Sequence, residues 1–177
     1  MTSQHRELID SATHERIRLT VAATSAIAIG LLAVLAVASC AIAGRLPDPI
    51  KTPGAILPNE TAATLCAKNF TTRSVRNVPK ALNDRVYALY GAKDHAGICA
   101  CKQGCEIDHL ISLEIGGSND ITNLWPQPYC GPLNAHIKDA LENKLHTLVC
   151  ANKVTLDEAQ QAISTDWVAA YKKYMAK

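Results

Sequence analysis

A chain of 177 residues is long enough for one globular domain with an accessory segment, and too short for several domains. Its formal net charge of +2 neither predicts nor excludes a nucleic-acid partner, because a local patch of charge can bind phosphate without a large total. Aromatic residues make up only 5% of the chain, which argues against a broad surface for stacking bases.

The N-terminal part of the chain is predicted to be a segment of its own. Residues 21–43 contain no charged side chain, and as a helix they would extend about 35 Å, enough to cross the hydrocarbon core of a membrane. Arg16 and Arg18 precede this run, and positive charge favours the cytoplasmic side. We therefore expect residues 1–20 in the cytoplasm, the apolar run in the membrane, and residues 45–177 outside the cytoplasm.

The end of the apolar run carries two different processing signals. The sequence VASC resembles a bacterial lipobox, which would make Cys40 the lipidated first residue of the mature protein. The sequence AIA at 41–43 is typical of ordinary signal cleavage, whereas the long leader before the run favours an uncleaved anchor. The sequence leaves anchor, lipoprotein and secreted protein open, and all three outcomes export the rest of the chain.

The cysteines agree with export. Besides Cys40, the chain has an even number of cysteines, which is typical of disulfide-bonded exported domains. The sequence does not fix how they pair. The alternative is a zinc site built from Cys99, Cys101, Cys105 and Cys130, although the C-x-C-x3-C spacing of the first three is unusual for zinc. We expect three disulfides among Cys66, Cys99, Cys101, Cys105, Cys130 and Cys150.

Proline divides the apolar run from the domain. Residues 44–60 are rich in proline, which fixes φ and removes hydrogen-bond donors, so we expect a stiff, extended tether there. The domain itself is expected over residues 61–177. Apolar spacing predicts a helix over 78–91, followed by a loop over 92–104 that the cysteines hold.

The middle of the domain predicts two strands and a turn. Apolar and polar residues alternate over 107–115, which predicts a half-buried strand. The sequence GGSND at 116–120 predicts a turn, and residues 121–125 a short second strand. Three prolines follow within 126–132, and we expect no regular structure from there until Asn134.

Two helices are predicted after this stretch. Asn134 is a good N-cap for the first, which continues to Cys150 with an apolar stripe along one side. Thr155 and Glu158 form a capping box that begins the second. Together these elements predict an α+β fold.

One constellation stands out in this order of elements. Asp108 and His109 lie on the first predicted strand, Asn123 on the second, and Asn134 and His136 at the start of the helix. This arrangement resembles the ββα-metal core of the HNH (His-Me finger) nucleases, and the wider sequence is similar to small exported bacterial proteins with such a core. The resemblance implies a hairpin–helix core with flanking helices, stapled by disulfides.

The resemblance also implies a role for each residue. His109 would act as the general base that takes a proton from water, held by a hydrogen bond from Asn123. One divalent ion, Mg²⁺ with Mn²⁺ or Zn²⁺ as alternatives, would bind Asp108 and either His136 or Asn134. Neighbours on a regular strand face opposite sides, so Asp108 and His109 share a site only if the strand bends or ends there.

The resemblance implies a nucleic-acid substrate, DNA with RNA as the alternative, cut with little sequence preference. Phosphate contacts are expected from Lys138 and from three arginines, Arg73, Arg76 and Arg85. An ordinary exposed pair with Asp139 is the alternative for Lys138. No protein partner is evident. The competing function is a non-catalytic, disulfide-stabilised module of the cell envelope that binds a ligand or has a structural role.

Overall fold

The computed structural model describes residues 46–91, 99 and 102–176, which belong to one unit, Ala43–Lys177. The apolar run over 21–43 and its processing signals lie outside the described residues, so those expectations stay predictions. Within the part that is described, no helix is long and apolar enough to cross a membrane. The fold is a mixture of helices and a small antiparallel sheet, as the sequence predicts, and it contains disulfides.

The sheet has two antiparallel strands, β1 (Cys105–His109) and β2 (Leu124–Pro128). Asp108 pairs with Trp125, and His109 pairs with Leu124. The prediction that prolines 126 and 128 exclude regular structure is wrong, because both lie in β2. Each strand of a two-stranded sheet has one edge that faces away from its partner. Proline is tolerated there because the N–H that it lacks would not have bonded to the other strand.

The strand predicted over 107–115 is confirmed only as far as His109, because the connection between the strands, residues 110–123, is a closed loop. Two short 3-10 helices lie in it, η1 (Leu113–Ile115) and η2 (Ile121–Asn123). Gly116 ends η1 with a φ of 80°, a conformation that favours glycine. A Cβ on Gly117 would lie 1.8 Å from the carbonyl oxygen of Ile111, so this position requires glycine. The Gly-Gly pair therefore closes the loop onto the end of β1.

Asn123 holds this loop together from inside. Its side chain is completely buried, and its Oδ1 accepts hydrogen bonds from the backbone N–H groups of Ile111 (2.9 Å) and Ala55 (3.3 Å). Its Nδ2 donates to the carbonyl oxygens of Ile111 (3.0 Å) and Ser118 (2.8 Å). The side chain thus satisfies backbone groups that would otherwise be buried without partners.

We expect Asn123→Ala to lower the free energy of unfolding by at least about 3 kcal/mol, because it leaves several buried backbone groups without hydrogen bonds. Urea denaturation measures this loss. Asn69→Ala removes an exposed asparagine and is expected to change stability by less than about 0.5 kcal/mol. Equal stability of the two variants would contradict the role of Asn123.

The proline-rich segment is not a free tether. Its described residues, 46–60, pack along the loop and β2: Gly54 N–H donates to Thr122 O (3.0 Å), and Leu57 N–H donates to Gly116 O (2.8 Å). The hydroxyl of Thr52 is buried and donates to Leu124 O. The expectation of a tether is therefore wrong for this part, because extended backbone rich in proline also serves to pack against a loop.

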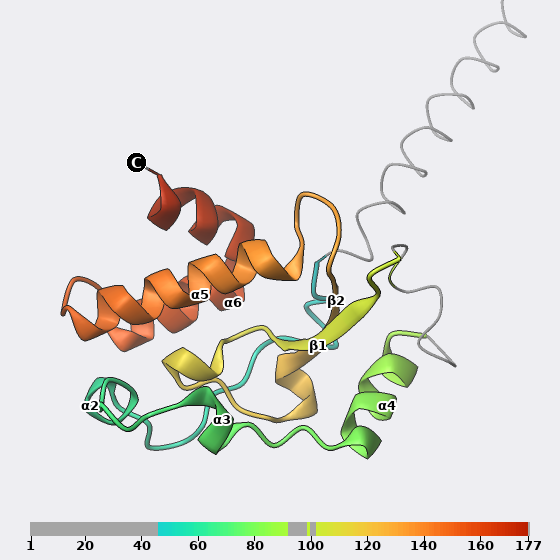
Figure 1. Cartoon of the computed structure of the whole chain (residues 1–177), viewed down its shortest axis with the longest axis horizontal. Coiled ribbons are helices and arrows are strands. Elements are labelled where there is room, and N and C mark those ends of the chain that lie inside the picture. The colour runs from blue at the N-terminus through green and yellow to red at the C-terminus, as the bar shows by residue number, and fades with distance from the viewer. Residues whose placement is uncertain (1–45, 92–98, 100–101, 177) are drawn as a thin grey trace, which may run out of the picture. The chain divides into compact units, whose positions relative to one another are not determined.

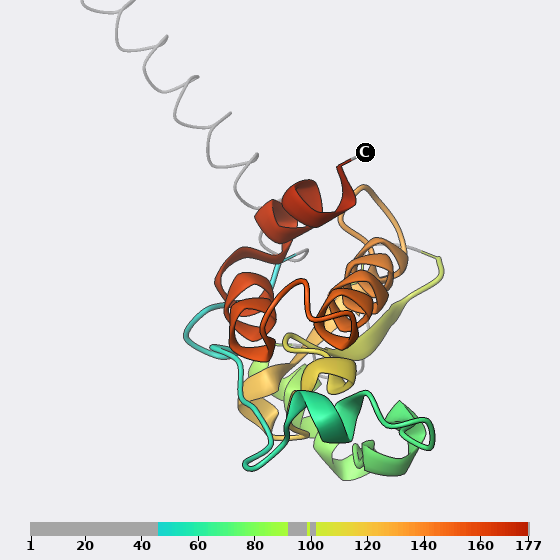
Figure 2. The same cartoon turned by 90° about the vertical axis from the view of Figure 1, so that its left-hand side faces the viewer.

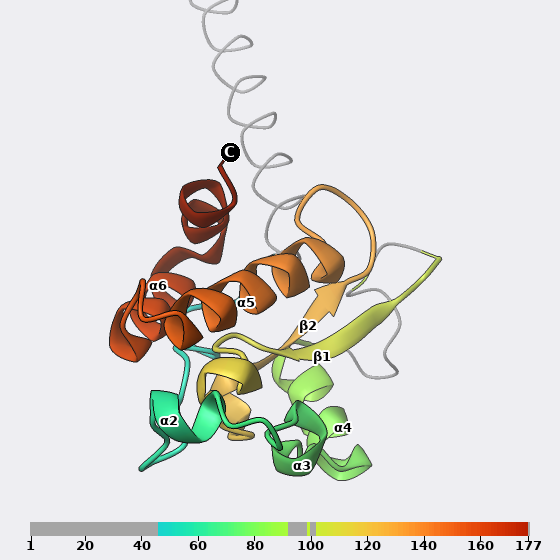
Figure 3. The same cartoon turned by 60° about the vertical axis from the view of Figure 1, so that its left-hand side comes forward.

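Five helices surround the hairpin: α2 (Ala62–Leu65), α3 (Thr72–Val75), α4 (Lys80–Leu89), α5 (Ala135–Cys150) and α6 (Leu156–Met175). The hairpin lies between α5 on one side and α4 on the other (Figures 1 and 3). Helices α5 and α6 pack side by side (Figure 2). Their inward faces form the core together with η1 and Trp125.

The helix ends follow the predicted capping chemistry. Asn134 is the N-cap of α5 and accepts from Ile137 N–H, and Thr155 and Glu158 form the capping box of α6. The sequence did not predict a kink at Asp166, whose backbone is non-helical. The Asp166 carboxylate accepts from Val168 N–H and Ala169 N–H, so it acts as a second N-cap inside α6.

Two of the three predicted disulfides lie among the described residues. Cys66 bonds to Cys150, and Cys99 bonds to Cys105. The second bridge uses two of the thiols that the zinc alternative requires. A third bridge between Cys101 and Cys130 would include a residue outside the described ones, and it stays a prediction.

Candidate active site

Asp108 and His109 share one pocket because β1 ends at His109. Both residues are buried, with 7% and 2% of their surface exposed. After His109 the chain turns, and Leu110 N–H donates to Asn123 O (2.8 Å). The strand thus ends at this pair, which is the condition under which Asp108 and His109 can share a site.

The pocket has a volume of about 230 Å³ and lies between the end of β1, η1, α3 and α5. Its walls are mostly polar, and they bring three further carboxylates and one arginine to Asp108 and His109, the two residues that the sequence singled out. The lining residues are Thr72, Arg76, Asp108, His109, Ser112, Leu113, Glu114, Asp139, Glu142 and Asn143. Of the three arginines predicted to bind phosphate, Arg76 lines this pocket.

The hydrogen bond that positions His109 comes from Asn119 and not from Asn123. The Nε2 of His109 lies 3.2 Å from Oδ1 of Asn119. Asn77 N–H donates to the same Oδ1 (2.9 Å), and Nδ2 of Asn119 donates to Val75 O (2.8 Å), so the orientation of this amide is fixed. An amide oxygen only accepts, so Nε2 carries the hydrogen and Nδ1 keeps a free electron pair.

Asn119 was missed because it lies in the GGSND segment, where asparagine is an ordinary turn residue. The sequence carries no local signal that distinguishes it from Asn123 as a partner of His109. Only the folding of the loop back toward α3 brings Asn119 to the imidazole. Asn123 instead has the structural role described above.

Burial sets the protonation state of His109. Desolvation lowers its pKa to about 4, against the opposing effects of the Asn119 hydrogen bond and the charge of Asp108. The ring is therefore neutral at pH 7. A neutral imidazole with a free Nδ1 is able to accept a proton.

This pKa predicts how stability depends on pH. His109 is protonated in the unfolded chain below pH 6.5 but stays neutral in the folded chain down to about pH 4, so unfolding takes up a proton in this range and stability falls as pH falls. We expect wild type to lose about 3 kcal/mol more than His109→Gln between pH 7 and pH 4, as measured by urea denaturation. If the free energy of unfolding fell equally with pH in wild type and in His109→Gln, the imidazole would not be desolvated.

Lys138 is buried and does not face solvent as a phosphate ligand would. Its ammonium lies 2.8 Å from Oδ2 of Asp108, pairs with Glu142, and donates to His109 O (2.6 Å). Burial opposes its charge, but the two carboxylates outweigh that effect and raise the pKa of Lys138 above its usual value. The expectation of a free phosphate-binding lysine is wrong, because this ammonium ties α5 to the end of β1.

The predicted ligands at the start of α5 do not line the pocket. Asn134 Oδ1 caps the helix, and its Nδ2 donates to Gly131 O (2.7 Å). His136 is exposed, stacks on Tyr129 with ring centroids 5.6 Å apart, and lies 3.8 Å from Asp139. The residues of α5 that reach the pocket begin one turn later, at Asp139 and Glu142.

No protein-family model, curated protein or solved structure matches this chain.

The pocket offers carboxylate oxygens to a divalent cation, although among the described residues no three of its acidic or histidine side chains bring ligand atoms within 4.8 Å of one another. Burial raises the pKa of Glu114, Asp139 and Glu142, and nearby negative charge adds to the shift of each. Oε2 of Glu114 is buried and has no hydrogen-bond partner among the described residues. Carboxylate oxygens are the ligands that Mg²⁺ and Mn²⁺ prefer. A cation here would relieve the repulsion and satisfy the unpartnered oxygen.

Proposed function

We propose that this chain is an exported, metal-dependent endonuclease of the HNH type, which hydrolyses phosphodiester bonds of DNA, with RNA as the alternative substrate. In this proposal β1, β2 and α5 form a ββα-metal core. The observation that carries it is the pocket in which a neutral imidazole, an arginine and four carboxylates meet. Such a set combines a base, a contact for phosphate and ligands for a cation.

The chain's own residues supply the proton transfer. Nδ1 of His109 takes a proton from the attacking water, while Asn119 holds the ring through Nε2. The Arg76 guanidinium is exposed at the pocket and contacts the scissile phosphate, for which its planar donors are suited. Nonspecific contacts to phosphate predict binding that weakens as salt is raised.

One divalent cation, Mg²⁺ with Mn²⁺ or Zn²⁺ as alternatives, completes the proposal. Asp139, Glu142, Glu114 and Asp108 are the side chains that would hold it, in place of Asn134 and His136. A cation held there would supply Lewis-acid stabilisation of the phosphoryl and leaving oxygens.

The disulfides support the proposed location. Structural disulfides persist in oxidising compartments outside the cytoplasm, and Cys66–Cys150 joins residues 84 apart in the sequence. We propose that residues 45–177 lie outside the cytoplasm and that residues 21–43 contact the membrane or are removed from it by processing.

A non-catalytic envelope module is the second candidate function, and one observation favours it. The Asp108 carboxylate is already neutralised by buried Lys138. An ion pair of this kind is what a purely structural core would use to join a helix to a hairpin. The two candidates differ in whether any substrate is cleaved.

The test uses the full, oxidised chain in mild detergent with supercoiled plasmid DNA. We expect nicking in the presence of Mg²⁺ or Mn²⁺, and we expect EDTA to abolish it and added metal to restore it, because the carboxylates hold the ion reversibly. Gel electrophoresis measures the fraction nicked. The absence of cleavage of DNA and RNA with Mg²⁺, Mn²⁺ and Zn²⁺ would favour the envelope module.

A further inference from the structure

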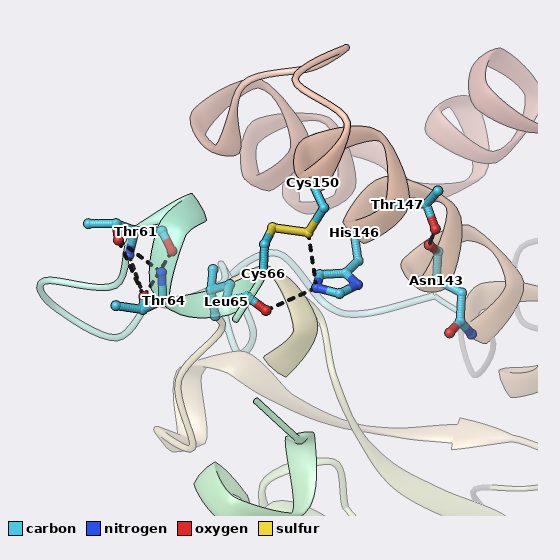
Figure 4. Close-up of a disulfide and its surroundings, with 8 residues drawn as sticks. All are labelled: Thr61, Thr64, Leu65, Cys66, Asn143, His146, Thr147 and Cys150. Carbon is cyan, nitrogen blue, oxygen red and sulfur yellow. Dashed lines mark hydrogen bonds between the residues drawn. A yellow bond between two sulfur atoms is a disulfide. The ribbon is translucent and has the colours of Figure 1, made fainter. Parts of the chain in front are cut away.

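A second group of metal-ligating side chains lies at the other end of α5 (Figure 4). Cys66 is the C-cap of α2, whereas His146 and Cys150 lie one turn apart on α5. One ligand atom from each residue lies within 4.8 Å of the other two. Nε2 of His146 lies 3.4 Å from Sγ of Cys150. This group is separate from the pocket that contains His109.

We propose that, when Cys66 and Cys150 are reduced, they bind one Zn²⁺ together with His146, and that this site alternates with the Cys66–Cys150 disulfide. The two states exclude each other, because a sulfur in the disulfide has no thiolate charge to offer a metal. The inference does not depend on the proposed nuclease activity.

The ligand atoms lie close together, but the two sulfurs must separate before they hold the ion. Zinc binds sulfur at about 2.3 Å and nitrogen at about 2.0 Å, so tetrahedral ligand atoms lie about 3.3–3.8 Å apart. The three ligand atoms lie within 4.8 Å of one another, two of them as the bonded sulfurs of the disulfide, so reduction has to let these sulfurs move apart. The spacing i, i+4 of His146 and Cys150 puts both on one side of α5. Cys150 is exposed, so water has access to the fourth position.

The ring nitrogen nearest the sulfurs is Nε2 of His146, which lies 3.4 Å from Sγ of Cys150. In the disulfide state Nε2 donates to Leu65 O (3.1 Å), so zinc binding at Nε2 requires this hydrogen bond to break and the ring hydrogen to move to Nδ1.

Conversion of the zinc-bound dithiolate to the Cys66–Cys150 disulfide needs a two-electron oxidant, and a small-molecule or protein disulfide supplies it. The Cys66 and Cys150 thiolates give two electrons to the oxidant's S–S bond, the protein disulfide forms, the oxidant leaves as two thiolates, and Zn²⁺ is released. A thiol reductant reverses these steps. Zinc thus holds α2 against α5 before oxidation and keeps these two thiols from pairing with other cysteines.

The test follows the alkylation of each cysteine in the reduced full chain, with and without equimolar Zn²⁺, by mass spectrometry of its peptides. We expect zinc to slow alkylation of Cys66 and Cys150 by more than about tenfold in wild type. His146→Ala should abolish this protection. Thr147→Ala changes the adjacent side chain and should keep it. Because each peptide is read separately, zinc bound at other cysteines does not contribute.

Two further measurements test the zinc site even if His146→Ala alters the fold. His146→Cys supplies a sulfur ligand in place of the ring and should restore protection. Adding an oxidised thiol reagent should release zinc, measured with a chromogenic chelator, in step with formation of the Cys66–Cys150 bridge. Alkylation rates that are the same with and without zinc, protection that persists in His146→Ala, or zinc that stays bound after the bridge forms would each overturn the site.

Discussion

Replacing His109 with alanine is expected to lower the rate of plasmid nicking by about 10²–10⁴-fold, the usual contribution of a positioned general base. The imidazole is neutral at pH 7, and because Nε2 donates to Asn119, its Nδ1 carries the electron pair that would take the proton. Nicking at saturating Mg²⁺, compared between proteins purified in the same way, measures the loss. Activity that survives this change would remove His109 from the mechanism.

Asn119→Ala sharpens this test, because Asn119 acts through His109. We expect a smaller loss of rate than for His109→Ala, together with a shift of the pH profile, since the Asn119 hydrogen bond fixes which ring nitrogen carries the hydrogen. A double variant that is no slower than His109→Ala alone would show that the two residues act as a unit. Additive losses would contradict the positioning role.

His136→Ala separates the two assignments of metal ligands. If the ligands come from the pocket, this exposed side chain contributes little, and the concentration of Mg²⁺ at half-maximal rate stays the same. If the assignment implied by the resemblance is right, more Mg²⁺ is needed. The concentration dependence of nicking distinguishes the two assignments directly.

Local chemistry is the part of the fold that the sequence predicts well. Asn134 and Thr155 begin helices as expected, because a cap depends on residues within one turn. The order of hairpin and helices also follows from local pattern. The extent of the first strand does not, because apolar and polar residues alternate through η1 as they would in a strand. There the Ser112 cap and the Gly-Gly turn override the alternation.

Contacts between distant segments are the part that the sequence does not predict. Asn119 and Asn123 are equally plausible partners of His109 until the loop closes. Lys138 lies beside the apolar stripe of α5, and only the position of β1 turns it into a buried cation. The polar pocket likewise depends on α3, which the sequence did not predict.

Lys138→Met is expected to lower the free energy of unfolding by about 3–5 kcal/mol, because it leaves two carboxylates buried without their counter-charge. Methionine keeps the length of the side chain, so the loss reports charge more than volume. Urea denaturation measures it. Lys144→Met changes an exposed lysine of the same helix and should alter stability by less than about 0.5 kcal/mol.

The loss caused by Lys138→Met should itself depend on pH. Without the ammonium, Glu142 escapes repulsion and desolvation by taking up a proton, so its pKa, which burial already raises, rises further in the folded variant. Folding of the variant then takes up protons, and its stability relative to wild type increases as pH falls. Glu142→Gln added to Lys138→Met should recover part of the loss at pH 7. A loss that is below about 1 kcal/mol or constant across pH would mean that water reaches the pair, and Asp108 would then be available to a metal ion without competition from Lys138.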